Sequence, residues 1–181
     1  SLLLLIGLFT LLIHLQAEET NSISNQDAFL NFSRLNTGGY GGPHFKITEI
    51  KDEMVMIGGG PVALVLNPNY SIFISGNYIE ADVEGIEMWY AGIGGEYTVF
   101  PENRLQILIN GQIGYGRVSY NYEEENYHAN IFLTEPEILL GIKIFESDRL
   151  KIGAGYRLIY GINNLPDLSN DEFRGPYAVV K

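Results

Sequence analysis

Residues 128–161 read HANIFLTEPEILLGIKIFESDRLKIGAGYRLIYG, and this stretch decides the fold. On both sides of the turn at residues 146–148, apolar positions alternate with positions that are mostly charged or glycine. Because successive strand side chains point to opposite faces, the stretch predicts a β-hairpin with one apolar face. Glycine with a few charges suits a crowded interior better than an open polar surface. The pattern therefore indicates apolar side chains outside and polar ones inside, which is typical of a transmembrane β-barrel. The expected outer face carries Ile138, Leu140, Ile142, Ile144, Ile152, Ala154, Tyr156, Leu158 and Tyr160.

Residues 1–17 read SLLLLIGLFTLLIHLQA, an apolar run that ends in a small residue and precedes acidic and polar sequence. A membrane-spanning helix needs ~20 apolar residues, so the run is too short for one. It predicts a secretory signal peptide, and since it lacks an initiator methionine and a basic start, we interpret it as N-terminally truncated. We expect a periplasmic lead-in over residues 18–38 and the barrel over residues 39–181, with a last strand that is also truncated.

Composition excludes several classes of protein. The formal net charge of −11 argues against nucleic-acid binding and against a basic anchor on anionic lipid. The absence of cysteine excludes a disulfide scaffold and a thiolate metal site. The 21 glycines and 12 tyrosines favour a small barrel, in which glycine relieves crowding and tyrosine lies at the membrane–water boundary.

The chain after the lead-in is a series of strands. Several exceed the ~5–6 residues of an average strand and match the ~9–11 residues of a tilted strand that spans a bilayer. No helix-period segment is long enough for a crossover between parallel strands. The predicted fold is therefore all-β, an eight-stranded antiparallel up-and-down transmembrane β-barrel. Its expected strands cover residues 40–50, 53–66, 70–79, 87–100, 104–119, 129–145, 149–161 and 174–181.

Tight and long connections alternate along the chain. Turn residues form tight connections at 67–69, 101–103 and 146–148. Long acidic connections are expected at 77–85, 120–128 and 162–173, while the first one, near residues 51–52, is short. In an up-and-down barrel this alternation puts the tight turns at one rim and the long loops at the other, as in outer-membrane barrels.

Aromatic residues collect near the expected strand ends. Two aromatic girdles, one at each interface, are typical of a barrel in a membrane. The girdle beside the tight turns is expected to contain Tyr70, Tyr97, Phe100 and Phe145. The girdle towards the long loops is expected to contain Tyr78, Trp89, Tyr115, Tyr120 and Tyr160.

The alternation also predicts which polar side chains point inward. The interior of an eight-stranded barrel is about filled by side chains, so buried charges need partners. We expect the lumen to be closed by a ladder in which Glu96, Glu135 and Glu137 face Lys46, Lys143 and Arg157. Gln106, Asn110, Gln112 and Lys151 share the inward parity.

A resemblance adds to this interpretation. The order GGYGGP, FKITEI, ALVLNPNYSIFISG, WYAGIGGEYTVFPENRLQI, FLTEPEILLGIKIF and RGPYAVVK resembles the small outer-membrane β-barrel proteins of the Bacteroidetes type. The likeness covers residues 38–181 and implies an eight-stranded barrel in a Gram-negative outer membrane, without assigned activity in most members. It implies outer-membrane lipid and the barrel-assembly machinery as partners. Family members commonly end in an aromatic residue, whereas this chain stops at Lys181.

Catalytic and ligand-binding readings are weaker. The glycine runs lack the Gly-Lys-Ser/Thr ending of a phosphate loop, so close packing is the preferred explanation. His128, Ser119 and Glu123–Glu125 are the residue types of a triad, although spacing alone does not make one. The acidic clusters at residues 80–84, 123–125 and 167–172 lack calcium-loop spacing and predict solvated loops. We expect no catalytic residue, no cofactor and no metal.

The leading hypothesis is a non-enzymatic integral outer-membrane β-barrel of structural or surface-recognition type, with long acidic external loops. A soluble periplasmic or secreted barrel that binds a lipid-like ligand in its lumen is one alternative. A lipid-modifying outer-membrane enzyme that works at the rim is the other. No nucleic acid is expected as a partner, and the ligand of the loops stays open.

Overall fold

The computed structural model describes residues 38–79, 85–122, 125–144, 149–162 and 165–181. The expected signal peptide, all but the last residue of the expected lead-in, and Phe145 of the expected girdle lie outside the described residues.

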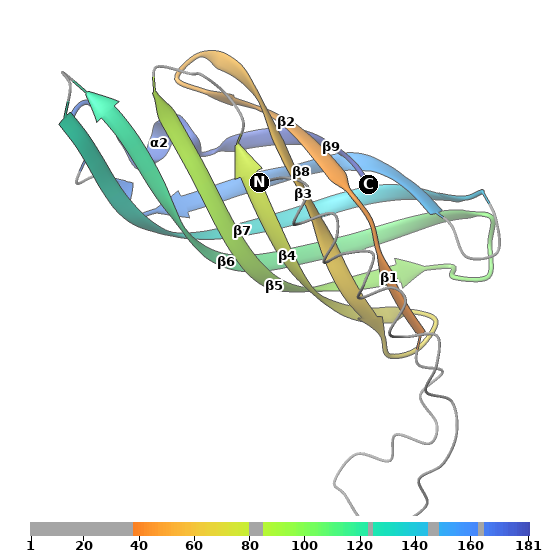
Figure 1. Cartoon of the computed structure of the whole chain (residues 1–181). Coiled ribbons are helices and arrows are strands. Elements are labelled where there is room, and N and C mark those ends of the chain that lie inside the picture. The colour runs from red at the N-terminus through yellow and green to blue at the C-terminus, as the bar shows by residue number, and fades with distance from the viewer. Residues whose placement is uncertain (1–37, 80–84, 123–124, 145–148, 163–164) are drawn as a thin grey trace, which may run out of the picture. The chain divides into compact units, whose positions relative to one another are not determined.

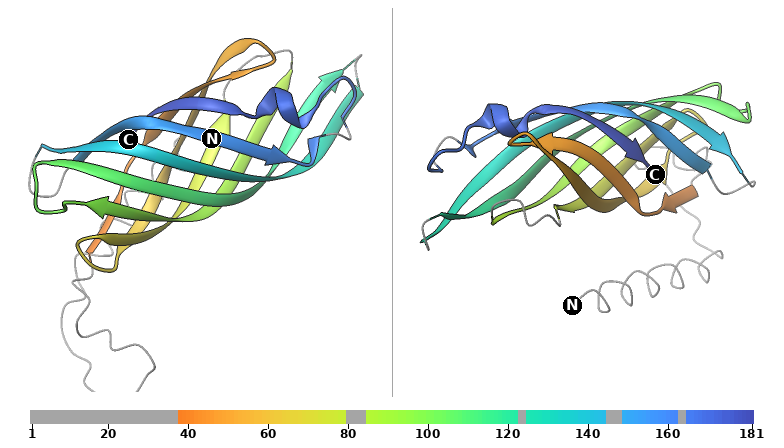
Figure 2. Two further views of the ribbon diagram at one scale, coloured as in Figure 1. Left: turned by 180° about the vertical axis from the view of Figure 1, so that it is seen from behind. Right: turned by 90° about the horizontal axis from the view of Figure 1, so that it is seen from above.

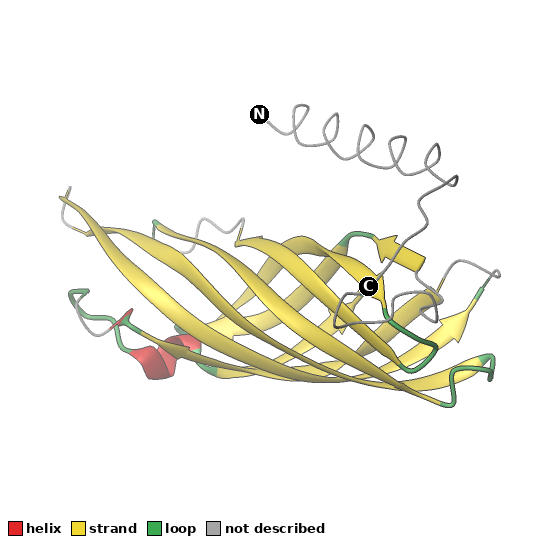
Figure 3. Ribbon diagram, turned by 90° about the horizontal axis from the view of Figure 1, so that it is seen from below, coloured by secondary structure: helices red, strands yellow, loops and turns green. Residues whose placement is uncertain are grey.

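The described chain forms one antiparallel sheet that closes on itself (Figures 1 and 2). From β2 onward each strand pairs with the next along the chain, β1 also pairs with β3, and β2 pairs with β9 to complete the ring. The strands are β1 (Gly38–Gly41), β2 (His44–Ile50), β3 (Glu53–Val65), β4 (Tyr70–Ile79), β5 (Ile86–Val99), β6 (Leu105–Tyr122), β7 (Glu125–Lys143), β8 (Arg149–Tyr160) and β9 (Gly175–Val180). One short helix, α2 (Asn170–Phe173), lies between β8 and β9 (Figure 3).

β1 and β2 together occupy one strand position. Both pair with β3, and one continuous register relates Gly38 to Val65 and His44 to Gly59. The interruption falls at residues 42–43, where Pro43 has no N–H to donate to the ladder. A Cβ on Gly60 would lie 2.4 Å from the Gly42 carbonyl oxygen, so only glycine permits this close approach. The predicted eight-stranded antiparallel up-and-down barrel is thus confirmed.

The described tight turns and the described long connection between β8 and β9 fall at opposite rims, as the sequence predicts. We call the rim with the turns at residues 66–69 and 100–104 the turn rim, and the opposite one, with residues 51–52 and 161–174, the loop rim. The short connection at the loop rim is a two-residue turn in which Lys51 and Asp52 both have positive φ, 51° and 61°. Two positive φ values are the signature of a type I′ turn, whose twist matches that of the flanking strands.

One expected loop is wrong. Residues 120–128 were predicted as a long connection, but β6 runs to Tyr122 and β7 starts at Glu125. The pairing continues through Asn121 and Asn126. The strands continue because the two-residue alternation persists there: Tyr120 is only 5 % exposed and packs in the interior, so it also does not belong to the outer girdle. Amide side chains on the outward face of these strands, at Asn121 and Asn126, and the acidic residues between them in the sequence suggest a loop.

The inward and outward faces follow the predicted alternation. On β7, Ile138 is 67 % exposed and Leu140 44 %, whereas Leu139 between them is 1 % exposed. The other expected girdle residues that the structure describes lie on the outer surface. They are Tyr70, Tyr97, Phe100, Tyr78, Trp89, Tyr115 and Tyr160.

The interior has two zones. Towards the turn rim it is mostly polar, with a small apolar group around Leu108 and Leu139, and towards the loop rim it is a large apolar cluster that the sequence did not predict. The segment between β8 and β9 supplies Ile162, Leu165, Leu168 and Phe173 to this cluster. Since these side chains close the mouth of the barrel, the wall facing them is apolar as well. Among the described residues, no helix is long and apolar enough to cross a membrane.

Candidate functional site

The largest polar cluster crosses the middle of the lumen. Lys46 on β2 and Glu135 on β7 form an ion pair with 2.5 Å between Nζ and Oε2, and both side chains are buried. Tyr90 on β5 donates its hydroxyl to the other oxygen of Glu135 at 3.0 Å, and the Gln112 amide on β6 also donates to this carboxylate. The Lys46 ammonium lies 4.9 Å from the centre of the Tyr177 ring. The contacts of Lys46 and Tyr90 with Glu135 join strands that are not neighbours in the sheet.

Glu137 extends the same cluster towards the turn rim. Its carboxylate lies 3.6 Å from Lys46 Nζ, accepts a hydrogen bond of 3.0 Å from the Tyr177 hydroxyl, and pairs with Lys181. Tyr177 fits because its cross-strand partner is Gly155, where a Cβ would lie 2.6 Å from the phenol oxygen. The predicted inward glycine therefore makes room for a hydrogen-bonding tyrosine.

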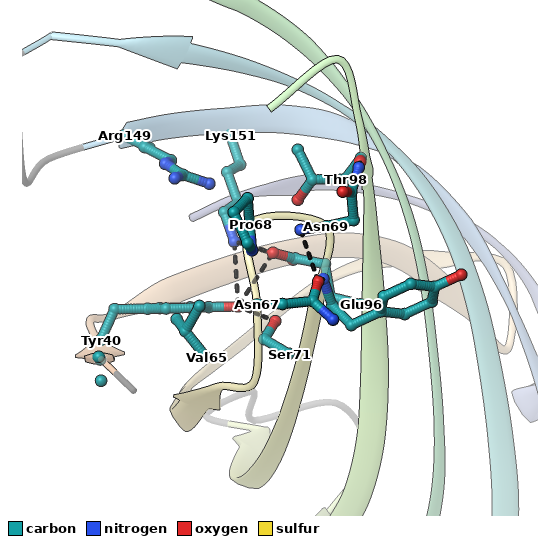
Figure 4. A pocket seen from close by; sticks show the side chains of 14 residues that line it. Tyr40, Val65, Asn67, Pro68, Asn69, Ser71, Glu96, Thr98, Arg149 and Lys151 are labelled. Atoms are coloured by element: carbon teal, nitrogen blue, oxygen red, sulfur yellow. Dashed lines mark hydrogen bonds and ion pairs between the residues drawn. The ribbon is translucent and has the colours of Figure 1, made fainter. Parts of the chain in front are cut away.

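A second polar group lies at the turn rim (Figure 4). Lys151 on β8 donates to both oxygens of Glu96 on β5, at 2.7 and 2.8 Å. Tyr40 on β1 donates to Glu96 at 3.0 Å, and the Lys151 ammonium lies 4.3 Å from the Tyr40 ring centre. These residues line a cavity of about 460 Å³, which Arg149 also borders.

Four of the six residues expected in the ladder are in these clusters: Lys46, Glu96, Glu135 and Glu137. The other two, Lys143 and Arg157, form no ion pair among the described residues. Lys143 reaches the turn rim and donates to the Pro101 carbonyl at 2.7 Å. Their expected places are taken by Lys151 and Lys181.

Arg157 donates hydrogen bonds to uncharged groups instead of forming an ion pair. It is fully buried, and its Nε donates to the carbonyl of Phe173 at 2.9 Å while Nη2 donates to Thr48 at 3.3 Å. It therefore holds the segment before β9 against the wall. Arg174 also holds this segment against the wall, because its Nε donates to the Ile159 carbonyl of β8 at 3.0 Å.

Sequence reasoning missed the inward tyrosines Tyr40, Tyr90 and Tyr177, and the buried pair of His44 and Asn77, whose side chains approach to 2.6 Å. The alternation of inward and outward positions along each strand could have identified them. Tyr90 shares the inward face of β5 with Met88, whereas Trp89 faces outward. The tyrosines were overlooked because aromatic residues were assigned to the girdles as a class.

The loop rim holds the remaining candidate. His128 Nδ1 and Ser119 Oγ lie 3.2 Å apart on neighbouring strands, beside a cavity of about 530 Å³. Glu87 faces Ser119 from the other side, so the serine, not the histidine, is in the middle. A triad needs the histidine between nucleophile and acid. Glu125 accepts from Tyr127 at 2.7 Å, while Glu123 and Glu124 lie outside the described residues.

The described part of the chain contains no group of three or more His, Asp or Glu side chains that could hold a metal. Two of the predicted acidic clusters include residues outside it. Apart from Arg157 and Lys143, which donate to uncharged groups, the charged groups of the two lumen clusters are paired with one another and with tyrosine hydroxyls. These ion pairs and hydrogen bonds hold opposite parts of the barrel wall together across the lumen.

Comparison with known proteins adds a likeness of fold. No protein-family model matches the chain, and neither does any curated protein. Among solved structures, the N-terminal β-barrel domain of Pseudomonas aeruginosa OprF is similar with a TM-score of 0.54 and 10% sequence identity over 81% of this chain and 94% of that one. Neisserial surface protein A (NspA) is similar with a TM-score of 0.56 and 8% identity over 79% of this chain and 95% of that one. At such low identity the shared feature is the barrel architecture.

Proposed function

We propose that the protein is an integral outer-membrane β-barrel of structural or surface-recognition type, without enzymatic activity and with a closed lumen. The observation that carries this proposal is the inverted polarity of the wall. Large apolar side chains are exposed on every strand position, while most of the charges along the middle of the strands are inside. The outer band includes Phe45, Ile47, Met56, Leu64, Ile72, Ile74, Ile93, Ile107, Ile109, Ile113, Phe132, Ile138, Leu140, Ile152 and Val180.

A soluble protein rarely exposes a contiguous apolar patch of more than a few hundred Å². Here the apolar band encircles the barrel, as expected for a surface that contacts the hydrocarbon core of a bilayer. Tyrosines near both ends of the strands support the same placement, because their rings favour the membrane–water interface. The paired Tyr70 and Tyr97 at the turn rim, with ring centres 4.8 Å apart, are one such group. Both fold neighbours are outer-membrane barrels.

The filled interior argues against the soluble alternative. A carrier of a lipid-like ligand needs an open apolar lumen, but the apolar zone near the loop rim is occupied by Phe173, Leu165 and Leu168. The polar zone is crossed by the buried ion pair of Lys46 and Glu135. The lumen therefore supports a closed barrel that is held by its own side chains.

The enzymatic alternative has one observation in its favour, the contact between His128 and Ser119. Among the described residues, no carboxylate accepts a hydrogen bond from the histidine, so none of them orients the imidazole. The non-enzymatic proposal needs no such group.

In the proposed orientation the turn rim faces the periplasm and the loop rim faces the exterior. Outer-membrane lipid would surround the wall, and the barrel-assembly machinery would insert the chain. Extraction tests the placement: the folded protein should enter the detergent phase and run as a heat-modifiable band on a gel. Recovery in the aqueous phase without such a band would contradict the proposal.

A further inference from the structure

Arg117 lies on the outer face of β6 and differs from the cations inside the barrel. Its side chain is exposed, and among the described residues it forms neither an ion pair nor a side-chain hydrogen bond. The lumen lysines Lys46 and Lys151 pair with carboxylates, and Arg157 binds a carbonyl. A cation without a partner on the surface of a chain with a net charge of −11 is available for an external anion.

The neighbours of Arg117 follow from the register. Trp89 on β5 and Asn130 on β7 are its cross-strand partners. Side chains that face each other across an antiparallel pair have Cβ atoms about 4.5–5.5 Å apart. The indole and the amide can therefore both reach a group that the guanidinium holds, and both carry N–H donors.

The outer surface changes character on either side of Arg117. Towards the turn rim, the next outward residues are Tyr115 and Phe132, which face each other, and then Ile113. Towards the loop rim, the next outward row consists of Glu87, Ser119 and His128. Arg117 is thus at the boundary between the apolar band and a polar surface.

The polar side of this boundary is hollow. The outward residues Glu87, Ser119, Asn121, Asn126 and His128 line the cavity of about 530 Å³ at the loop rim, together with Tyr78, Gly85 and the buried residues Ile79, Ile86 and Tyr120. Amide, hydroxyl, carboxylate and imidazole groups can hydrogen-bond to sugar hydroxyls as donors and as acceptors. A ligand with many hydroxyl groups suits this lining better than an apolar one.

We propose that this face of β5, β6 and β7 binds the phosphorylated sugar headgroup of a lipid in the outer leaflet. Arg117 would hold the phosphate, the cavity beside Ser119 and His128 would take sugar hydroxyls, and the acyl chains would lie on Tyr115 and Phe132. At about 3.4 Å per residue, Tyr115 and Ser119 are separated by about 14 Å along the strand, enough for one headgroup. The proposal rests on the membrane placement proposed above.

The guanidinium is suited to this ligand. Its planar fork matches two phosphate oxygens at once, and charge-assisted bonds of this kind are about twice as strong as neutral ones. The one carboxylate of the neighbouring row, Glu87, faces Ser119 and not Arg117. Its carboxylate would accept hydrogen bonds from sugar hydroxyls.

The test uses folded protein in detergent, titrated with lipid A and with dephosphorylated lipid A, and bound lipid is measured by native mass spectrometry. The wild type should prefer the phosphorylated lipid. Arg117→Gln should weaken binding of lipid A about tenfold, as expected for the loss of one charge-assisted contact, and should remove the preference. Inorganic phosphate should not compete, because it lacks the acyl and sugar contacts.

Arg104→Gln is the matched control, since Arg104 is also exposed but lies at the turn rim. It should leave the preference intact. Equal binding of the two lipids by the wild type, an equal loss in both variants, or competition by inorganic phosphate would overturn the proposal. If the protein gives a heat-modifiable band but shows no preference, the lipid site fails and the membrane placement stands. If it gives no such band, both fail.

Discussion

Lys46 Nζ and Glu135 Oε2 lie 2.5 Å apart although 89 residues separate them in the chain, and both side chains are buried. They belong to β2 and β7, which are not neighbours in the sheet. The ion pair therefore crosses the lumen and joins two sides of the wall.

Removing one partner of this ion pair should lower the free energy of unfolding more than removing both. Lys46→Met leaves the Glu135 carboxylate buried without its cation, and breaking a buried pair in this way typically costs about 3–5 kcal/mol. The double variant Lys46→Met/Glu135→Leu should recover a large part of this loss. The measurement is urea unfolding of the protein in vesicles, followed by the heat-modifiable band. A double variant as unstable as the single one would show that the pair does not act as a unit.

A charge on the outer band should be costly only in a membrane. Leu140 is 44 % exposed on β7, so in a soluble protein Leu140→Arg would change the stability by no more than about 0.5 kcal/mol. Facing lipid three residues from the turn-rim end of β7, it should cost about 1–3 kcal/mol, because a lipid-facing charge costs about 2–4 kcal/mol at the bilayer midplane and about 0–1 kcal/mol near the interface. Leu140→Phe is the control and should be nearly neutral. Unfolding in vesicles measures both, and a neutral Leu140→Arg would argue for an aqueous surface.

The segment before β9 should close the mouth through Phe173. This side chain is fully buried in the apolar cluster, and replacing a buried phenylalanine with alanine costs about 3–5 kcal/mol. Phe173→Ala should also speed trypsin cleavage after Arg174, because the segment loses its anchor. Asp167→Asn, at an exposed position with φ of 52° that asparagine tolerates, should change neither property. Equal cleavage in all three proteins would mean that the segment is held by other contacts.

The closed lumen should not conduct. The polar zone is spanned by paired side chains and the apolar zone is filled, so reconstituted protein in a planar bilayer should show no sustained large conductance. Stable conductance steps like those of a porin would mean that several copies form an oligomeric pore or that the segment filling the mouth of the barrel moves aside.

The alternation in residues 128–161 was enough to predict the barrel and its two faces, because burial on one face only imposes a strict two-residue period. The same rule would have corrected residues 120–128, where Tyr120 and Ala129 continue the inward series. Composition was misleading there, since the acids and amides at the end of a paired hairpin resemble those of a loop.

Ion-pair partners could not be predicted from parity. Parity assigns Glu96, Lys143 and Lys151 to the inside, but the stagger of the strands decides which of them meet across the lumen. Glu96 meets Lys151 at 2.7 Å, while Lys143 ends beside Pro101. The apolar residues that fill the loop-rim end of the barrel could not be predicted from parity either, because Phe173 reaches the interior from a connection and not from a strand.

The claim that the apolar face of the barrel contacts lipid is tested most directly by spin labels. The chain has no cysteine, so single cysteines at positions 138, 139 and 140 can be labelled one at a time in vesicle-inserted protein. Labels that replace Ile138 and Leu140 should be accessible to oxygen in the bilayer and shielded from a water-soluble nickel complex. The label that replaces Leu139 should be shielded from both. Ready access of the nickel complex to the labels at positions 138 and 140 would contradict the account.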